Sequence, residues 1–280
     1  MSVISAVFQA IIQGLTEFLP VSSSGHLSLY QHFTGNSGEG ALLFSAILHL
    51  GTLCAVFIAF WNTIRDLIYE FCRMVRDVFK RQFSFKDMNG DRRAVLMVIL
   101  STAVLIPFYI FKDFFEGFAE DSSIFAEGLC FLYTAAILLL ADKCSKGKKA
   151  LGDITVKDSV FVGFFQSIAL LPGVSRSGST ISAGLFSGFS RDTAVRYSFV
   201  LGIPAILGGC LVEVKDAVQT DMSFSWTYIL GFIVAAVVGI CAIKMVDWLV
   251  KTDKFKIFSY YTGVLGVVVI LVSIFERIAL

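Results

Sequence analysis

Long apolar runs separated by short charged segments make up most of the 280-residue chain. A helix of about 20 apolar residues crosses the hydrocarbon core of a bilayer, and six runs approach that length with few charges. Hydrophobic residues make up 56% of the chain and charged residues 16%, unlike an ordinary soluble domain. We therefore predict an all-α polytopic membrane protein, one integral membrane domain over 1–280, with full transmembrane helices at 41–60, 94–111, 124–141, 197–212, 226–243 and 260–279.

Two further apolar stretches, 1–33 and 160–190, are interrupted near their centres by Pro, Gly and Ser residues. Neither arm of either stretch is long enough to cross a bilayer. We therefore predict two re-entrant helical hairpins whose tips end near mid-membrane. Non-helical backbone at that depth is tolerated only where it is buried in protein or lines a cavity, so the two tips are the first candidates for a functional site.

The same sequence motif occurs at both tips. Residues 13–26 read QGLTEFLPVSSSGH and residues 166–179 read QSIALLPGVSRSGS, and the two align without a gap. The duplication divides the chain into two repeats, 1–141 and 160–280. Each repeat consists of a hairpin followed by three predicted spans.

The distribution of basic residues predicts how the spans are oriented. Because Lys and Arg favour the cytoplasmic side, their clusters are assigned to the cytoplasm and the acidic loops to the outside. Three spans separate the hairpins, so the second repeat begins on the opposite side and the repeats have inverted topology, which places sites near the midplane where they meet. The basic segments are 61–93, which also has the pattern of an amphipathic helix, 142–159, 191–196 and 244–259; the acidic ones are 112–123 and 213–225.

The two copies of the motif differ in their reactive groups. The first carries Glu17 and His26, a carboxylate and an imidazole suited to acid–base chemistry. The second carries Arg176, whose guanidinium matches phosphate oxygens. Both carry serines and loop N–H groups that can hold an anion. Together these groups predict phosphoryl transfer or hydrolysis, although Arg176 as a purely structural counter-ion to Glu17 stays open.

The candidate residues follow from this division. Gln9, Gln13 and Glu17 recur every four residues and share one helix face. His49, a lone histidine inside a predicted span, is interpreted first as a packing residue and only second as catalytic. The candidate catalytic residues are Glu17, Ser23, His26 and Arg176, and the candidate phosphate-binding residues are Gln13, Ser22, Ser24, Gly25, Ser175, Ser177 and Gly178.

The motifs QGLTEFLPVSSSGH and PGVSRSGST resemble the two signature motifs of the bacterial undecaprenyl-pyrophosphate phosphatases, the BacA-type bacitracin-resistance family. The resemblance implies hydrolysis of the lipid carrier's pyrophosphate to the monophosphate and inorganic phosphate, which recycles the carrier for cell-wall polymer synthesis. It also implies a site on the outer side of the bacterial inner membrane, and a divalent cation, Mg²⁺ or Ca²⁺. The family's essential acid, serine, histidine and arginine match Glu17, Ser23, His26 and Arg176.

The motifs leave the metal ligands, the nucleophile and the class of function open. Many family members have a glutamate where this chain has Gln13, which leaves Glu17 as the main candidate metal ligand. Either Ser23 or a water is the nucleophile, with His26 or Glu17 taking the proton. A transporter or lipid-carrier flippase that only binds the phosphate headgroup is the alternative, because inverted repeats with broken hairpins are typical of transporters. The expected partners are a polyprenyl pyrophosphate and membrane lipids, with no nucleic acid; a homodimer is left open.

Overall fold

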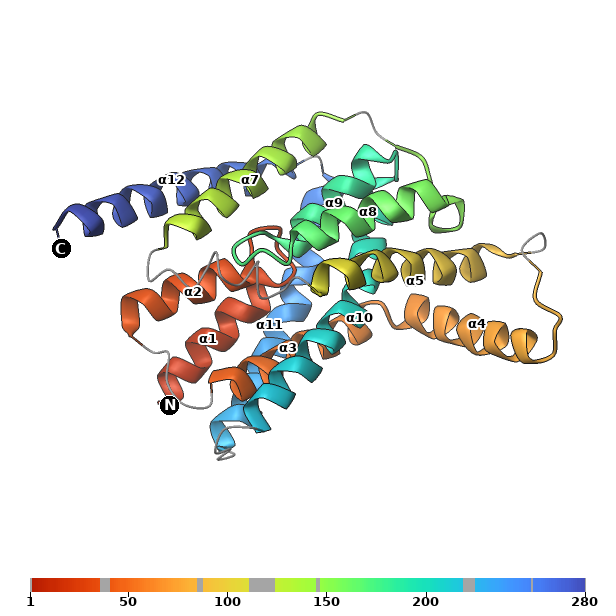
Figure 1. The fold of residues 1–280 in the computed structure, drawn as a ribbon, viewed down its shortest axis with the longest axis horizontal. Helices are drawn as coiled ribbons and strands as arrows, with labels where there is room; N and C mark the ends of the chain where they lie inside the picture. The colour runs from red at the N-terminus through yellow and green to blue at the C-terminus, as the bar shows by residue number, and fades with distance from the viewer. Residues whose placement is uncertain are drawn as a thin grey trace.

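A computed structural model describes residues 2–35, 41–84, 88–110, 124–144, 147–218, 225–252 and 254–279. Within these ranges the regular elements are helices, and the β-structure is limited to one isolated bridge between Lys149 and Phe189. The helices form an elongated bundle in which the two ends of the chain lie on the same side of Figure 1. The acidic segment predicted at 112–123 lies outside the described residues.

The two interrupted stretches are helix–loop–helix units. The first consists of α1 (Val3–Thr16) and α2 (Ser23–Thr34), and the second of α8 (Val156–Ile168) and α9 (Arg176–Phe186). Side chains cap the entering helices: Ser2 accepts a hydrogen bond from the Ser5 N–H, and Thr155 forms a capping box with Asp158. The motif residues therefore occupy the last turns of α1 and α8, the two loops and the first turns of α2 and α9.

Five helices in the described part of the chain are long and apolar enough to cross a membrane, which makes the chain a multi-pass membrane protein. Three of them are longer than predicted, since α10 begins at Arg191, α11 continues to Lys251 and α12 begins at Lys256. Charges near these ends do not stop a helix, because Asp192 in a first turn and Lys251 in a last turn complement the helix dipole. The five are α3 (Ala41–Ala59), α7 (Phe125–Asp142), α10 (Arg191–Val218), α11 (Trp226–Lys251) and α12 (Lys256–Ala279).

The sixth predicted span, 94–111, corresponds to α5 (Gly90–Tyr109), which is not among these five helices. Its first turn carries three charged residues, Asp91 to Arg93, and Pro107 lies near its end. It packs against α4 (Trp61–Phe79), the amphipathic helix predicted within 61–93. One face of α4 is buried, and Figure 1 shows α4 and α5 projecting together from one end of the bundle.

Helices of one repeat pack against helices of the other. The first helix of each hairpin packs against the other repeat, α1 on α11 and α8 on α5, while α3 pairs with α10 and α7 with α12. Glycines permit the close approach: a Cβ on Gly14 would lie 2.9 Å from the Ala235 carbonyl oxygen, and one on Gly163 would lie 2.7 Å from that of Ser101. The two repeats are therefore interlocked, and both motif loops lie in the interior.

Candidate active site

The two motif loops cap the helices that follow them in the same way. Ser22 is the N-cap of α2 and accepts a hydrogen bond from the Gly25 N–H at 3.2 Å; Ser175 is the N-cap of α9 and accepts one from the Gly178 N–H at 3.0 Å. A helix N-terminus presents N–H groups and a partial positive charge, which favour bound anions. Both caps line one cavity, so two such helix ends meet there.

Hydrogen bonds also join one loop to the other. The Ser24 hydroxyl accepts from the Gly173 N–H at 3.1 Å, and the Ser177 hydroxyl donates to the Leu19 carbonyl at 3.2 Å. Gly173 has a φ of +93°, a left-handed conformation that glycine adopts at little cost. The loops are thus fixed relative to each other by contacts to their backbones.

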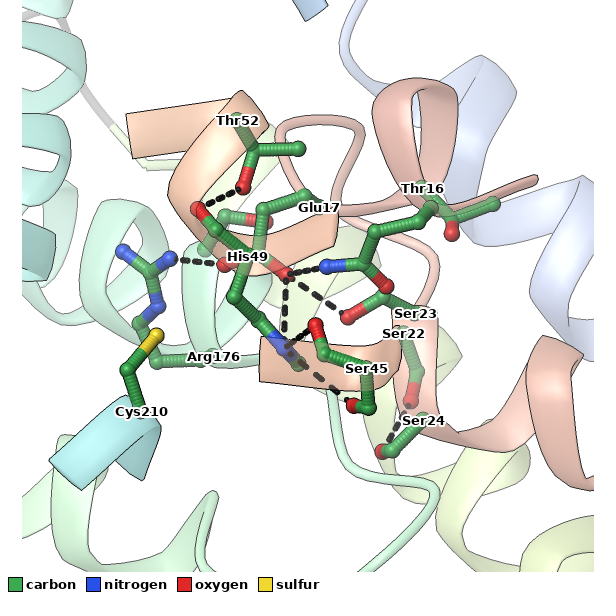
Figure 2. A network of polar contacts seen from close by, with 12 residues as sticks. Thr16, Glu17, Ser22, Ser23, Ser24, Ser45, His49, Thr52, Arg176 and Cys210 are labelled. Atoms are coloured by element: carbon green, nitrogen blue, oxygen red, sulfur yellow. Dashed lines mark hydrogen bonds and ion pairs between the residues drawn. The ribbon is translucent and has the colours of Figure 1, made fainter. Parts of the chain in front are cut away.

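Glu17 and Arg176 form an ion pair between the two copies of the motif. Glu17 is 8% exposed; its Oε1 accepts a hydrogen bond from Arg176 Nη2. Its Oε2 accepts from Gln13 Nε2 at 3.0 Å and from the Ser23 hydroxyl at 2.8 Å. Figure 2 shows Ser23 of α2 and Arg176 of α9 reaching the Glu17 carboxylate. The structure therefore joins the acid, serine and arginine predicted from the sequence.

The Arg176 guanidinium fills a space that a glycine leaves open. A Cβ added to Gly202 in α10 would overlap with the guanidinium group. Only one of the five N–H donors of an arginine is needed for the bond to Glu17. The side chain keeps 17% of its surface exposed, which leaves its other donors able to bind a ligand.

These groups line a cavity of ≈ 220 Å³. Its wall includes seven of the eleven residues predicted for the site: Glu17, Ser22, Ser23, Ser24, Ser175, Arg176 and Ser177. Gln13 does not line the cavity but donates a hydrogen bond to Glu17, which does. The N–H groups of Gly25 and Gly178 donate to the hydroxyls of the capping serines. The volume suits a phosphate headgroup rather than a large ligand.

His26 is directed away from this cavity. Its Nδ1 is 2.7 Å from the Ser22 carbonyl oxygen, and its Nε2 is 2.7 Å from the Tyr261 hydroxyl. The ring also stacks on Tyr261 and meets the edge of Phe131. Ser22 has a φ of 73°, a conformation unusual outside glycine. The contact from His26 thus supports the strained backbone next to Ser23 rather than the cavity itself.

His49 is the imidazole that lines the cavity. Its Nε2 lies 4.0 Å from Glu17 Oε2, while its Nδ1 lies 3.0 Å from the Ser45 carbonyl oxygen and 3.6 Å from Glu213 Oε2. The Ser45 hydroxyl donates to the other Glu213 oxygen at 2.9 Å. Figure 2 shows His49 reaching from α3 toward Glu17. From the sequence, His49 is interpreted first as a packing residue and only second as catalytic. The structure places it in the cavity wall.

Glu213 is a further cavity residue that the sequence reasoning missed. The charge pattern places it in an acidic outer segment, 213–225, but α10 continues as a helix to Val218. Ile206, Cys210 and Glu213 all line the cavity from α10. Their spacing of four and three residues places them on one helix face. That periodicity is the sequence signal that could have located Glu213.

The donors around Glu17 do not form a closed metal cage. No group of three or more His, Cys, Asp or Glu side chains in the described ranges could hold a metal ion. Gln13 Oε1, however, is buried and without a hydrogen-bond partner among the described residues. Mg²⁺ is commonly held by one or two carboxylates together with substrate phosphates and water. Glu17 and the Gln13 carbonyl oxygen fit a cation of this kind.

The fold and the cavity define a multi-pass helical membrane protein with an internal polar site built from a duplicated loop. The family model for the bacitracin resistance protein BacA matches residues 6–268. The chain therefore belongs to the BacA family.

Relatives align over nearly their whole length. The undecaprenyl-diphosphatase of Alkaliphilus metalliredigens (strain QYMF) is 39% identical, over 98% of this chain and 100% of the relative. The undecaprenyl-diphosphatase of Halothermothrix orenii is 38% identical, over 98% and 99%. That of Methanosphaera stadtmanae is 36% identical, over 98% and 99%.

Proposed function

We propose that the protein hydrolyses undecaprenyl pyrophosphate to undecaprenyl phosphate and inorganic phosphate, and so recycles the lipid carrier for cell-wall polymer synthesis. The observation that carries this proposal is the Glu17–Arg176 pair, which joins the two motif loops at one cavity. An acid, a serine hydroxyl, a guanidinium and two helix N-termini around one cavity suit the hydrolysis of a phosphoanhydride. The names of the relatives support the substrate.

The reaction is assigned to the groups on the cavity wall. Arg176 and the first-turn N–H groups of α2 and α9 bind the pyrophosphate and stabilise charge in the transition state. The Ser23 oxygen attacks the terminal phosphorus as Glu17 Oε2, 2.8 Å away, takes the hydroxyl proton. The new O–P bond replaces the bond to the lipid phosphate, which leaves with the electron pair. Water then attacks the phosphoserine and releases phosphate.

A water activated by Glu17 is the rival nucleophile. In that route Ser23 positions the water and the phosphoryl group without forming a bond. Loss of phosphate release in Ser23→Ala, together with a trapped phosphoserine in wild type, supports the covalent route. Near-normal turnover by Ser23→Ala would support the water route.

The remaining predicted residues have supporting roles in this proposal. Ser22 and Ser175 cap the two helices, Ser24 and Ser177 join the loops, and these bonds aim the N–H groups at the substrate. A divalent cation, Mg²⁺ or Ca²⁺, would be held by Glu17 and Gln13 together with substrate oxygens. When bound, such a cation neutralises phosphate charge.

The membrane arrangement is also part of the proposal. We assign six spans, α5 included, and two re-entrant hairpins to an inverted-topology repeat of residues 1–141 and 160–280, in a bacterial inner membrane with the site open to the outside. The exchange of α1 and α8 between the repeats supports this assignment. Membrane lipids surround the bundle, and a homodimer is the assembly to test.

A flippase or transporter that only binds the headgroup is not favoured, because the similar relatives are named as diphosphatases. The decisive experiment is phosphate release from undecaprenyl pyrophosphate by the detergent-purified protein. Wild type should release phosphate. Arg176→Ala should lose about 10²–10³-fold in kcat because it removes a group that stabilises the transition state, and Glu17→Gln should lose about 10²–10⁴-fold because it removes the general base. Carrier movement across liposomes without phosphate release would support the flippase instead.

A further inference from the structure

The side-chain amide of Gln166 is buried in α8 without a hydrogen-bond partner. Gln166 is 2% exposed, and neither its Nε2 nor its Oε1 has a partner among the described residues. A buried amide that makes no hydrogen bonds is costly and uncommon in folded proteins. A ligand that completes these bonds would account for its presence.

The duplication explains why this amide has no partner. Gln166 aligns with Gln13, which donates to the carboxylate of Glu17 four residues later. Four residues after Gln166 the chain has Leu170, which offers no acceptor. The second copy therefore keeps the amide and lacks its carboxylate, so the donor is available to a different acceptor.

Gln166 lines a second cavity, of ≈ 330 Å³, next to the first. The two cavities share Arg176, Ala169, Ala205 and Gly209, so the guanidinium lies in the wall of both. Beyond Gln166 and Arg176, the polar side chain in this lining is Thr102, whose hydroxyl already donates to the Val98 carbonyl at 2.8 Å. Gln166 and Arg176 are thus the donors that a ligand would meet there.

An apolar groove continues from the second cavity. A third cavity, of ≈ 680 Å³, shares Thr102, Ile106 and Pro204 with the second and is lined almost entirely by apolar side chains of α3, α4, α5 and α10. From the first cavity to the third, the lining therefore changes from hydroxyls and Glu17 to Arg176, then to Gln166, and finally to apolar side chains. A prenyl pyrophosphate has the same order: terminal phosphoryl group, lipid-linked phosphate, prenyl chain.

We propose that Gln166 binds the phosphate that stays on the lipid, with the terminal phosphoryl group beside Ser23 and Arg176 between the two. This inference rests on the proposed hydrolysis. As the bond between the terminal phosphorus and the bridging oxygen breaks, the electron pair passes to the lipid phosphate. The Gln166 N–H and Arg176 then stabilise the charge on that leaving group, and no proton is required from the protein.

The test compares Gln166→Leu with Ser167→Ala, a change at the next residue of α8, whose hydroxyl already donates to the Gly163 carbonyl at 2.9 Å and which lines none of the three cavities. The full chain is purified in detergent, and inhibition by farnesyl phosphate and by inorganic phosphate is measured against a prenyl pyrophosphate substrate. We expect Gln166→Leu to raise the inhibition constant of farnesyl phosphate and the KM about 10-fold, the loss of one hydrogen bond to a charged group. Inhibition by inorganic phosphate should not change, and Ser167→Ala should behave as wild type.

Thermal melting separates this binding role from a packing role. Because Gln166→Leu removes an unpartnered buried amide, its melting temperature without ligand should equal or exceed that of wild type. Its stabilisation by farnesyl phosphate should be smaller than that of wild type. Unchanged inhibition by farnesyl phosphate in active Gln166→Leu, or a lower melting temperature with unchanged inhibition, overturns the proposal.

Failure of the proposed function gives a different result. A wild-type protein that releases no phosphate contradicts the hydrolase assignment but leaves the binding measurement intact. In that case equal stabilisation of wild type and Gln166→Leu by farnesyl phosphate still overturns the role of Gln166.

Discussion

Ser24 and Ser177 occupy equivalent positions in the two copies of the motif, and each bonds to the backbone of the opposite loop. Ser24 accepts from Gly173 and Ser177 donates to Leu19, so the two bonds run in the same direction, from the second loop to the first. Because both partners are backbone groups, these bonds hold the loops together independently of the Glu17–Arg176 pair. The geometry of the site thus has a support that is separate from its charged groups.

Removing the hydroxyl of Ser24 or Ser177 should lower the thermal stability of the protein more than it lowers the rate of phosphate release. Ser24→Ala leaves the Gly173 N–H unpaired, and Ser177→Ala leaves the Leu19 carbonyl unpaired, each at about 1–2 kcal/mol. We expect melting temperatures in detergent to fall by about 2–5 °C. Ser182→Ala is the matched control, since the Ser182 hydroxyl is buried without a hydrogen-bond partner among the described residues. Equal melting of all three variants would contradict the role of the two serines.

His26 should act by positioning the loop, and one substitution can separate this role from that of a base. Asn places an amide N–H near the position of the histidine Nδ1 and can still donate to the Ser22 carbonyl. We therefore expect His26→Asn to keep at least 10-fold more kcat than His26→Ala, about the effect of one hydrogen bond. Steady-state phosphate release at saturating substrate checks this. Equal loss in both variants would fit a base and count against positioning.

His49 and Glu213 should act as a pair. His49→Leu removes the imidazole beside Glu17 and leaves the Glu213 carboxylate without its ion pair, so kcat/KM should fall about 10-fold. Because Glu213→Leu disturbs the same contact, the double variant should lose less than the sum of the two single losses in free energy. A double-mutant cycle on kcat/KM measures this coupling. Strictly additive losses would show that the two residues act separately.

Gln13→Glu should strengthen cation binding. A second carboxylate would lie next to Glu17, where the amide nitrogen is now 3.0 Å from the carboxylate oxygen. Without a cation the two negative charges repel, so the melting temperature in EDTA should fall relative to wild type. Added Mg²⁺ should restore it, and the Mg²⁺ concentration for half-maximal phosphate release should drop about 10-fold. A melting temperature that does not respond to Mg²⁺ would exclude a cation at these residues.

Acid should weaken the contact between α4 and α5. Glu70 is 5% exposed; burial raises its pKa, but hydrogen bonds from Arg73, Asn89 and Arg92 outweigh burial and hold the pKa below 4.5. A carboxyl with a lowered folded-state pKa stabilises the fold above its unfolded pKa, and this contribution is lost as the pH falls through the folded value. Melting temperatures should therefore decline below about pH 4.5 more steeply in wild type than in Glu70→Gln. Parallel curves would contradict this role for Glu70.

The sequence predicted the helices better than their ends. Apolar runs located α3, α7, α10, α11 and α12 because burial in a bilayer selects for composition over a fixed length. The extra turns of α10 and α11 carry charges, and a hydropathy pattern cannot tell a charged helix end from a charged loop. The same ambiguity placed Glu213 in an outer segment, although its side chain faces the cavity from a helix.

The structure brings together the predicted residues Glu17, Ser23 and Arg176 but directs the predicted residue His26 elsewhere. Glu17, Ser23 and Arg176 could be assigned from the aligned motif copies, because the loops that carry them meet. His26 lies in the same motif, yet its rotamer turns it toward Tyr261 of α12, a contact across 235 residues. His49 enters the cavity through the pairing of α3 with α10. Such long-range contacts depend on packing that no local pattern records.

The exchange of helices between the repeats also sets the order of events during synthesis. Helix α1 ends at Thr16, but its packing partner α11 begins at Trp226, about 210 residues later. At about 5–20 residues per second, the ribosome takes roughly 10–40 s to supply that partner. During this interval the first hairpin must wait in the insertion machinery or the lipid without α11, and Glu17 also waits for Arg176, its ion-pair partner in the second repeat. The insertion machinery or a chaperone is therefore expected to shield Glu17 until the second half of the chain arrives.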